Sequence, residues 1–262
     1  MLKYILTIMN KTLQKIEIIE LAVVKFGSII TNSQLNGLLL GYKNKNDKIH
    51  KLLKEGWLVK LRRELYYISK IGSFGFTSIS NYKIANLIGE ESFVSFEAAL
   101  KFHGLFDQSI RNYRSISKKQ YLQKKIEEID YKYIKVKDKN YFGWSEESVD
   151  GGIAIIALKE RALLDLLEYH RTVNSVSLVL ESLQNNYDDF GKDWFIKNLQ
   201  YYSKVTASSF GFLLDLVNRD SSYIYLTLID KKIPTLKMFS SAKKFNKKWR
   251  IYYDPILEEQ VK

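Results

Sequence analysis

The chain has 262 residues, of which 46% are hydrophobic and 27% charged, and these proportions are typical of a soluble globular protein with room for two domains. Cysteine does not occur, which excludes disulfides, thiolate catalysis, and zinc or iron–sulfur sites held by thiolates. No apolar run reaches the roughly 18 residues that span a bilayer, and no signal peptide is recognisable. We therefore expect a cytoplasmic protein without a membrane span.

Basic residues outnumber acidic ones, with 41 Lys and Arg against 29 Asp and Glu, and the formal net charge is +12. Such an excess favours a polyanionic partner, most often a nucleic acid. Of the 41 basic residues 33 are lysine, as expected from AT-rich codons, so the location of the charge is more informative than its sum. Residues 1–70 carry +8 of the +12, and the basic charge is therefore concentrated near the N-terminus.

Three short helices are predicted in this basic segment. They cover Lys11–Phe26, Gln34–Leu40 and the stretch between Asn44 and Gly56. Gly27 and Gly41 end the first two helices, and Thr31, Asn32 and Ser33 supply capping side chains for the second. In the third helix the apolar residues recur at helical spacing, so its lysines are expected to face outward.

A β-hairpin is predicted after the third helix. Trp57–Leu61 alternates apolar and polar side chains, Arg62–Glu64 is a charged turn, and Leu65–Ile68 is a second β-prone run. Three short helices followed by a two-stranded wing indicate a winged helix-turn-helix, which we expect over residues 1–70.

The third helix and the wing carry side chains suited to DNA. A helix fits the major groove, where amides read adenine while flanking cations hold phosphates, and arginines at a wing tip can enter a minor groove. The residues expected to contact DNA are Tyr42, Lys43, Asn44, Lys45, Asn46, Lys48, Lys51, Arg62 and Arg63. The alternative is that the winged helix docks protein and that its lysine row is simply a solvated face.

Residues 71–80 are expected to be a linker, and residues 81–262 a larger mixed α/β domain, so that the fold class is α+β. Helices are expected over Tyr82–Ile88, over Phe96–Phe102 with Ser95 as its cap, over Lys159–Tyr169, and over most of Val173–Val217. Strands are expected over Arg111–Ser117, Ile129–Val136 and Ile153–Ala157, with a loop around Phe142–Gly152 and β-prone runs at Tyr223–Ile229 and Trp249–Tyr253. Arg161 and Asp165 are spaced for an i,i+4 pair.

No enzyme is expected from these residues. Gly72 and Ser73 could begin a nucleotidyltransferase signature, but no Asp-x-Asp pair follows at a useful distance, so a linker is the better interpretation. His103 lies at a helix end, where a structural role is more common than general-base catalysis. We expect no catalytic residue, no metal site and no cofactor.

Five segments of the chain together resemble a known family. They read "LLKEGWLVKLRRELYYIS", "FVSFEAALKFHGLFDQ", "IAIIALKERALLDLLEYH", "SSFGFLLDLV" and "KKWRIYYD", in this order. The chain resembles, over nearly its whole length, the AbiEi antitoxins of abortive-infection toxin–antitoxin systems. One departure lies in the wing, where the family usually carries a glycine just before the tyrosine of the second strand and this chain has Glu64 and Leu65.

The resemblance implies a DNA-binding autorepressor of its own promoter whose C-terminal domain supplies the antitoxin function. Its functional partner would be a nucleotidyltransferase-like toxin encoded beside it. Such systems are classed as type IV because the antitoxin opposes the toxin's action without necessarily binding the toxin. The alternative is a winged-helix transcriptional regulator of another operon, with a C-terminal domain that senses a ligand or a protein. The identity of the adjacent gene separates these two hypotheses.

Overall fold

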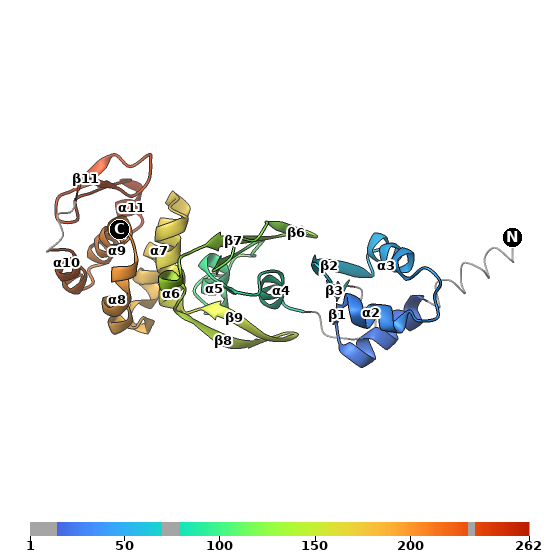
Figure 1. Cartoon of the computed structure of the whole chain (residues 1–262). Helices are drawn as coiled ribbons and strands as arrows, with labels where there is room; N and C mark the ends of the chain where they lie inside the picture. Colours follow the sequence, from blue (N-terminus) through green and yellow to red (C-terminus); the bar gives the residue numbers. More distant parts are fainter. Residues whose placement is uncertain (1–14, 70–78, 230–233, 262) are drawn as a thin grey trace. The chain divides into compact units, whose positions relative to one another are not determined.

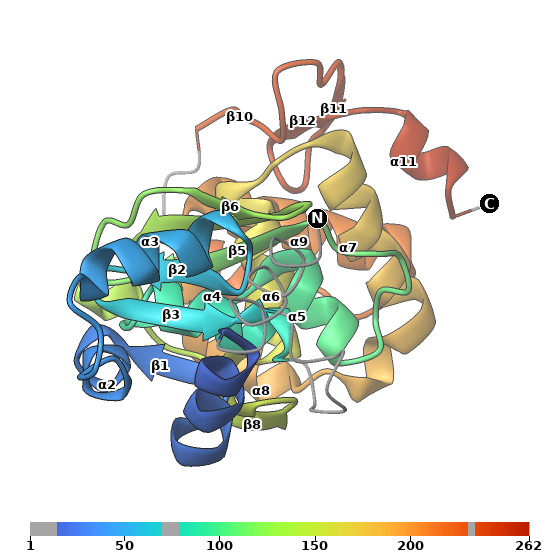
Figure 2. The same cartoon turned by 90° about the vertical axis from the view of Figure 1, so that its right-hand side faces the viewer.

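The computed structural model describes residues 15–69, 79–229 and 234–261 (Figures 1 and 2). The chain divides into two compact units. The first unit comprises the residues up to Glu90 together with Glu146–Ala154, and the second comprises Glu91–Ser145 and Ile155–Lys262. The protein is of the α+β class, as the sequence predicts. Within the described ranges, no helix is both long and apolar enough to cross a membrane.

The first unit begins with a helix and a strand, followed by two more helices and a hairpin. Its elements are a helix over residues 15–26, β1 (Ile29–Thr31), α2 (Asn32–Leu38), α3 (Lys45–Lys54), β2 (Leu58–Arg62), β3 (Leu65–Ile68) and α4 (Asn81–Ile88). The three strands form an antiparallel sheet in the order β1-β3-β2. β1 was not predicted, because three residues after a glycine give too short a pattern to separate from a turn.

Two of the predicted helix ends are formed by the expected residues, but Gly41 does not end the second helix, because α2 ends at Leu38 with Leu39 as its C-cap. Gly27 has φ +76°, and its N–H donates to the Val23 carbonyl at 2.8 Å, so it ends the first helix in the left-handed conformation that glycine favours. Thr31 caps α2 in a capping box with Gln34: the Gln34 N–H donates to Thr31 Oγ1 at 3.2 Å, and the Thr31 N–H donates to Gln34 Oε1 at 2.8 Å. The predicted start of the first helix at Lys11 lies outside the described residues.

One apolar core joins the N-terminal helix, α2 and α3 to the three-stranded sheet. The buried residues come from the N-terminal helix, from β1, α2 and α3, and from the hairpin: Ile18, Ile19, Ala22, Val23, Ile30, Leu35, Leu39, Ile49, Leu52, Leu58, Tyr66 and Ile68. Because α3 contributes Ile49 and Leu52 to this core, its opposite face is left for solvent.

α4 belongs to the first compact unit, whereas the sequence-based division placed it at the start of the second domain. Of the predicted linker only Ile79 and Ser80 are described. Ile79 is buried, and the Ser80 N–H donates to the Asp150 carbonyl at 2.9 Å. Lys83 of α4 then donates through Nζ to the Ile153 carbonyl at 2.7 Å. These long-range contacts, which local patterns do not reveal, hold α4 and Glu146–Ala154 in one unit.

The chain after α4 forms a six-stranded sheet, a helical part and a small three-stranded sheet. The large sheet has the order β6-β7-β5-β4-β9-β8, with β4 (Ser92–Val94), β5 (Asn112–Ser117), β6 (Lys124–Ile126), β7 (Ile129–Lys135), β8 (Trp144–Val149) and β9 (Gly152–Ala157). The helices are α5 (Phe96–Phe102), α6 (Lys159–Tyr169), α7 (Val173–Asn186), α8 (Lys192–Asn198), α9 (Lys204–Leu216), α10 (Ser222–Ile229) and α11 (Ile256–Glu259). The small sheet has the order β10-β12-β11, with β10 (Leu236–Lys237), β11 (Lys244–Asn246) and β12 (Ile251–Tyr253).

Two predictions for the later part of the chain are wrong. Most of the loop predicted around Phe142–Gly152 is the edge strand β8, whose exposed or half-buried, mostly polar side chains give little apolar signal. The β-prone run Tyr223–Ile229 is helical, in α10. Packing of α10 against α9 and α8 overrides the strand propensity of its β-branched and aromatic residues, and Asp220 Oδ1 accepts from the Ser222 N–H at 2.9 Å where the helix begins.

Trp249 anchors the small sheet of the second unit. Its indole is fully buried, and Nε1 donates to Asp215 Oδ2 of α9 at 2.6 Å. A Cβ added at Gly211 of α9 would overlap the Trp249 ring, so glycine is needed for this close approach. Trp249, just before β12, is therefore a packing residue of the second unit.

Candidate nucleic-acid interface

The exposed face of α3 brings together most of the residues predicted to contact DNA. α3 begins at Lys45, directly after Asn44, and buries Ile49 and Leu52. Tyr42, Lys45 and Lys48 are half-buried, whereas Lys43, Asn44, Asn46 and Lys51 are exposed. Asp47 in the first turn and Lys51 and Lys54 in the last turn suit the helix dipole. The result is a polar, mainly cationic helix face on a rigid apolar support.

A shallow hollow of about 540 Å³ lies where α2 and the first turn of α3 meet. Its lining residues are Asn36, Lys43, Asn44, Lys45, Asn46 and Asp47. Although Asn44 occupies the N-cap position of α3, its side chain makes no capping hydrogen bond. Within the described ranges, the side-chain amides of Asn36, Asn44 and Asn46 have no hydrogen-bond partner, so their donors and acceptors face solvent unused.

Lys48 is less free than the other lysines of α3. Its Nζ lies 4.9 Å from the centre of the Tyr42 ring, a distance suited to a cation–π contact. Partial burial lowers the pKa of Lys48, and the charges of Lys15 and Lys51 add to this effect, which Glu55 opposes. Glu55 is itself paired with Lys15, whose Nζ lies 2.6 Å from Oε2. Lys48 thus contacts Tyr42 of the predicted interface and also lies in the field of the Lys15–Glu55 ion pair.

The two arginines predicted at the wing tip have different surroundings. Arg62 donates through Nε to the Leu87 carbonyl at 3.1 Å and forms an ion pair with Glu90, so it ties the hairpin to α4 within the first unit. Arg63 has a side chain that is 93% exposed, and its Nε lies 3.8 Å from Glu64 Oε1. The Arg62 side chain is thus partly exposed but held by these contacts, whereas the guanidinium of Arg63 extends into solvent.

Glu64 adopts a strained conformation in the turn between β2 and β3. Its φ is +59°, in the left-handed region that favours glycine, and the Asn32 N–H donates to its carbonyl at 2.9 Å. This is the part of the wing where the AbiEi resemblance leads one to expect a glycine. Glutamate at this position therefore keeps a glycine-like backbone at a cost in conformational energy.

We expect Glu64→Gly to raise the free energy of unfolding by about 0.5–1 kcal/mol, because relief of the left-handed strain exceeds the extra chain entropy of glycine. Urea unfolding followed by circular dichroism measures the change. As a control, Glu20→Gly at an exposed position of the N-terminal helix should lower stability, since glycine is a poor helix former. A loss of stability in Glu64→Gly would show that the Glu64 side chain contributes more than its backbone costs.

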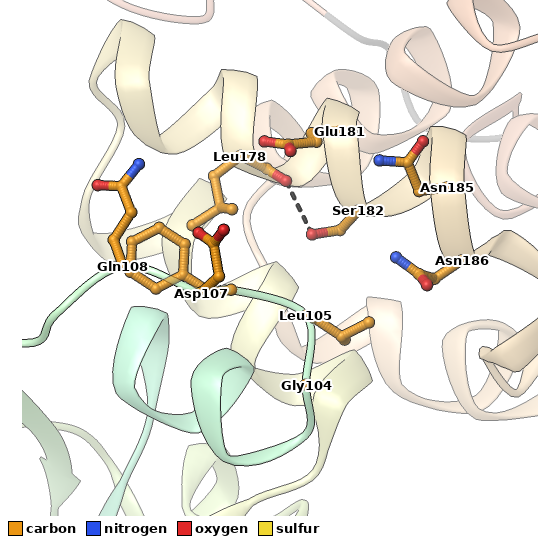
Figure 3. Close-up of a pocket in the computed structure, with 10 residues that line it drawn as sticks. Gly104, Leu105, Asp107, Gln108, Leu178, Glu181, Ser182, Asn185 and Asn186 are labelled. Carbon is orange, nitrogen blue, oxygen red and sulfur yellow. Dashed lines mark hydrogen bonds between the residues drawn. The ribbon is translucent and has the colours of Figure 1, made fainter.

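The second unit contains two neighbouring hollows of different character. One, of about 220 Å³, lies between the segment after α5 and α7, and Figure 3 shows Asp107 and Gln108 facing Leu178 and Glu181 across it. The second has a volume of about 600 Å³ and shares Phe106, Gln108, Leu178 and Glu181 with the first. Neither hollow is lined by lysine or arginine. Their chemistry is thus unlike that of the α3 face.

The Arg161–Asp165 pair predicted from its spacing lies in the core of the second unit. Both side chains are almost completely buried, and Arg161 Nε lies 2.9 Å from Asp165 Oδ1. The guanidinium carbon is 4.6 Å from the centre of the Phe142 ring. Ser95, predicted to cap α5, instead donates its hydroxyl to Asp165 Oδ2 at 2.6 Å. Burial raises the pKa of the Asp165 carboxyl, and the charge of Arg161 opposes the rise.

His103 is also occupied by a contact within the second unit, since its Nε2 lies 2.8 Å from the Ala157 carbonyl. Among the described residues, no group of three or more His, Asp or Glu side chains is placed to hold a metal ion. The α3 face is therefore the best-developed candidate site of the described chain.

The fold, but not the sequence, has a recognisable relative. The crystal structure of the RV2827C protein from Mycobacterium tuberculosis superposes with a TM-score of 0.67, covering 93% of this chain and 92% of that chain. The two sequences are 12% identical, so the similarity concerns the fold alone. No family model matches the chain, and no curated protein matches it.

Proposed function

We propose that the protein binds DNA through a winged helix-turn-helix, with α3 in the major groove and the β2–β3 hairpin as the wing. The element order of the first unit supports this: a helix and a short strand precede α2 and α3, and an antiparallel hairpin follows. In helix-turn-helix proteins the second helix of the motif is the one that reads the major groove. α3 is that helix here.

The observation that carries the proposal is the composition of the α3 face. Lys43, Lys45 and Lys51 provide cations for phosphates, and Asn44 and Asn46 provide amides for base edges. The opposite face is buried in the core, so this arrangement is held rigidly. A protein-docking role for the same face would more often require exposed apolar or aromatic anchors, and Tyr42 is the one aromatic residue in this group.

The AbiEi resemblance leads to the complete proposal. The protein is an antitoxin and transcriptional autorepressor of a toxin–antitoxin operon in the bacterial cytoplasm. It binds the operator of its own promoter and counters a nucleotidyltransferase-like toxin encoded by the adjacent gene. The catalytic chemistry belongs to the toxin, and the antitoxin needs neither a metal nor a cofactor for this role.

We expect the purified protein to bind its own upstream region with an affinity that falls steeply with salt, because lysines that neutralise phosphates release counterions. With about four phosphate contacts, the logarithm of the binding constant should fall by about 3.6 per tenfold rise in salt. Gel-shift titrations at several salt concentrations measure this slope. An unrelated duplex of equal length is the control, and equal affinity for both duplexes would contradict operator recognition.

A second candidate function is a regulator of another operon whose second unit senses a ligand. The hollow of about 600 Å³ favours it, because its volume falls in the usual range of small-molecule sites. Its lining combines the apolar Phe106 and Leu178 with the polar Glu97 and His170. The adjacent gene distinguishes the two candidates, since a nucleotidyltransferase-like neighbour is expected only for the antitoxin.

A further inference from the structure

We infer that the α3 face selects A·T base pairs in the major groove, through the unpartnered amides of Asn44 and Asn46. This inference rests on the proposed DNA binding and names the bases that the same site prefers. It goes beyond charge, because the lysines of the interface attract any duplex, whereas the amides discriminate between base pairs.

The side-chain amides of Asn44 and Asn46 make no hydrogen bond to the described residues. Asn44 stands at the N-cap of α3, where an asparagine side chain usually accepts a hydrogen bond from the helix backbone. Here it makes no such bond, and within the described residues the side-chain amide of Asn46 likewise forms no hydrogen bond with another group. Both lie at the hollow between α2 and α3, with Asn36 on the other side of it.

The hydrogen-bonding groups of an asparagine amide match those of adenine in the major groove. Adenine presents N7 as an acceptor and N6 as a donor in the major groove, and an asparagine amide pairs with both at once. Asp47, the carboxylate at the same hollow, accepts from the exocyclic amines of adenine and of cytosine alike, so it offers nothing to guanine itself and does not choose between A·T and G·C pairs. The amides thus favour adenine over guanine.

α3 and the segments around it lack arginine, the residue that most often recognises guanine. Arginine most often recognises the guanine O6 and N7 pair, and the sequence from residue 32 to residue 61 contains no arginine. Arg62 follows directly, but its guanidinium is engaged by the Leu87 carbonyl and Glu90. Arg63 lies in the hairpin turn, where a wing meets a minor groove. The lysines remain as donors to guanine O6 and N7, and a flexible ammonium makes this contact with less geometric specificity than the planar guanidinium of arginine.

Three alternating duplexes of equal length test the inference: poly(dA-dT), poly(dI-dC) and poly(dG-dC). In the major groove an I·C pair shows the same acceptors as a G·C pair. In the minor groove it lacks the guanine amino group and therefore resembles an A·T pair. We expect the full-length protein to bind poly(dA-dT) at least about 5-fold more tightly than either other duplex, the lower limit for one amide–adenine pair. Fluorescence anisotropy at constant salt measures the three affinities.

The double variant Asn44→Ala, Asn46→Ala assigns the effect to these amides. It should lose the preference while it keeps the salt dependence, and a preference caused by the flexibility of the A·T duplex would survive in it. Because neither amide supports the described fold, the circular dichroism spectrum should not change. Asn185→Ala, at an exposed position of α7 in the second unit, is the matched control and should keep the preference.

The possible results separate the inference from the proposed function. Equal affinity for the three duplexes, or a preference that persists in the double variant, overturns the inference and leaves DNA binding intact. If poly(dA-dT) and poly(dI-dC) bind equally, and both more tightly than poly(dG-dC), the selection lies in the minor groove and the inference is again overturned. Failure to bind any of the duplexes, or the upstream region, overturns the proposed function and the inference together.

Discussion

Replacement of Arg161 by alanine is expected to lower the free energy of unfolding of the second unit by about 3–5 kcal/mol, because it leaves a buried carboxylate without its partner. Asp165 is fully buried, and in the variant it would keep only the hydroxyl of Ser95 as a described partner. The contacts of the guanidinium with the rings of Phe142 and Tyr202 are also lost. Chemical unfolding of the full chain, followed by tryptophan fluorescence, measures the loss.

Two further variants separate the ion pair from its surroundings. Arg171→Ala, on the exposed segment after α6, should change stability by less than about 0.5 kcal/mol. The double variant Arg161→Met, Asp165→Leu should be more stable than Arg161→Ala, since no unpaired charge remains. If Arg161→Ala cost less than about 1 kcal/mol, water would have to solvate Asp165, and the core described here would be wrong at this point.

The triple variant Lys43→Ala, Lys45→Ala, Lys51→Ala is expected to weaken binding to the upstream region at least about 100-fold at physiological salt, because three charged phosphate contacts are lost. Its salt slope should also fall by about three, one for each phosphate. All three residues lie outside the buried stripe of α3, so the fold should persist. Gel-shift titrations over a salt series give both numbers.

A triple variant of the second unit, Lys135→Ala, Lys137→Ala, Lys139→Ala, removes the same charge from exposed positions of the other unit and is the matched control. It should bind the upstream region as the original protein does. The α3 variant should still protect cells from the adjacent gene product when both are expressed from independent promoters, because repression then has no effect on survival. Equal loss of DNA binding in both triple variants would show a general charge effect and contradict a specific role for α3.

The fold was predictable mainly where the local sequence pattern itself determines the structure of a segment. Gly27 ends a helix because only a residue without a Cβ enters the left-handed conformation freely, and this rule is visible in the sequence. α6 spans Lys159–Tyr169, as its periodicity predicts. β4, β6 and β8 were missed because they are short or mostly polar, and α10 because strand propensity conflicted with packing.

The candidate site was predictable in its composition and much less in its contacts. The sequence places Lys43 and Asn46 at the start of one helix, but it does not show that the Asn44 side chain makes no cap. The sequence indicated that Arg62 is a free cation at the wing tip. Its partners Leu87 and Glu90 lie more than 20 residues further along the chain, so local patterns do not reveal them. The spacing of Arg161 and Asp165 indicated a pair, yet only tertiary packing places it in the core.

The division of the chain restricts how such a protein can acquire a new DNA target. The chain passes between the units at 90/91, 145/146 and 154/155, so the first unit is not a cassette that recombination can exchange at one junction. A foreign N-terminal segment joined near residue 78 would also leave Glu90 without Arg62. Single substitutions on the exposed face of α3 disturb neither constraint. Divergence of target sites in this lineage should therefore proceed through point changes at positions such as 44 and 46, with the rest of the unit inherited whole.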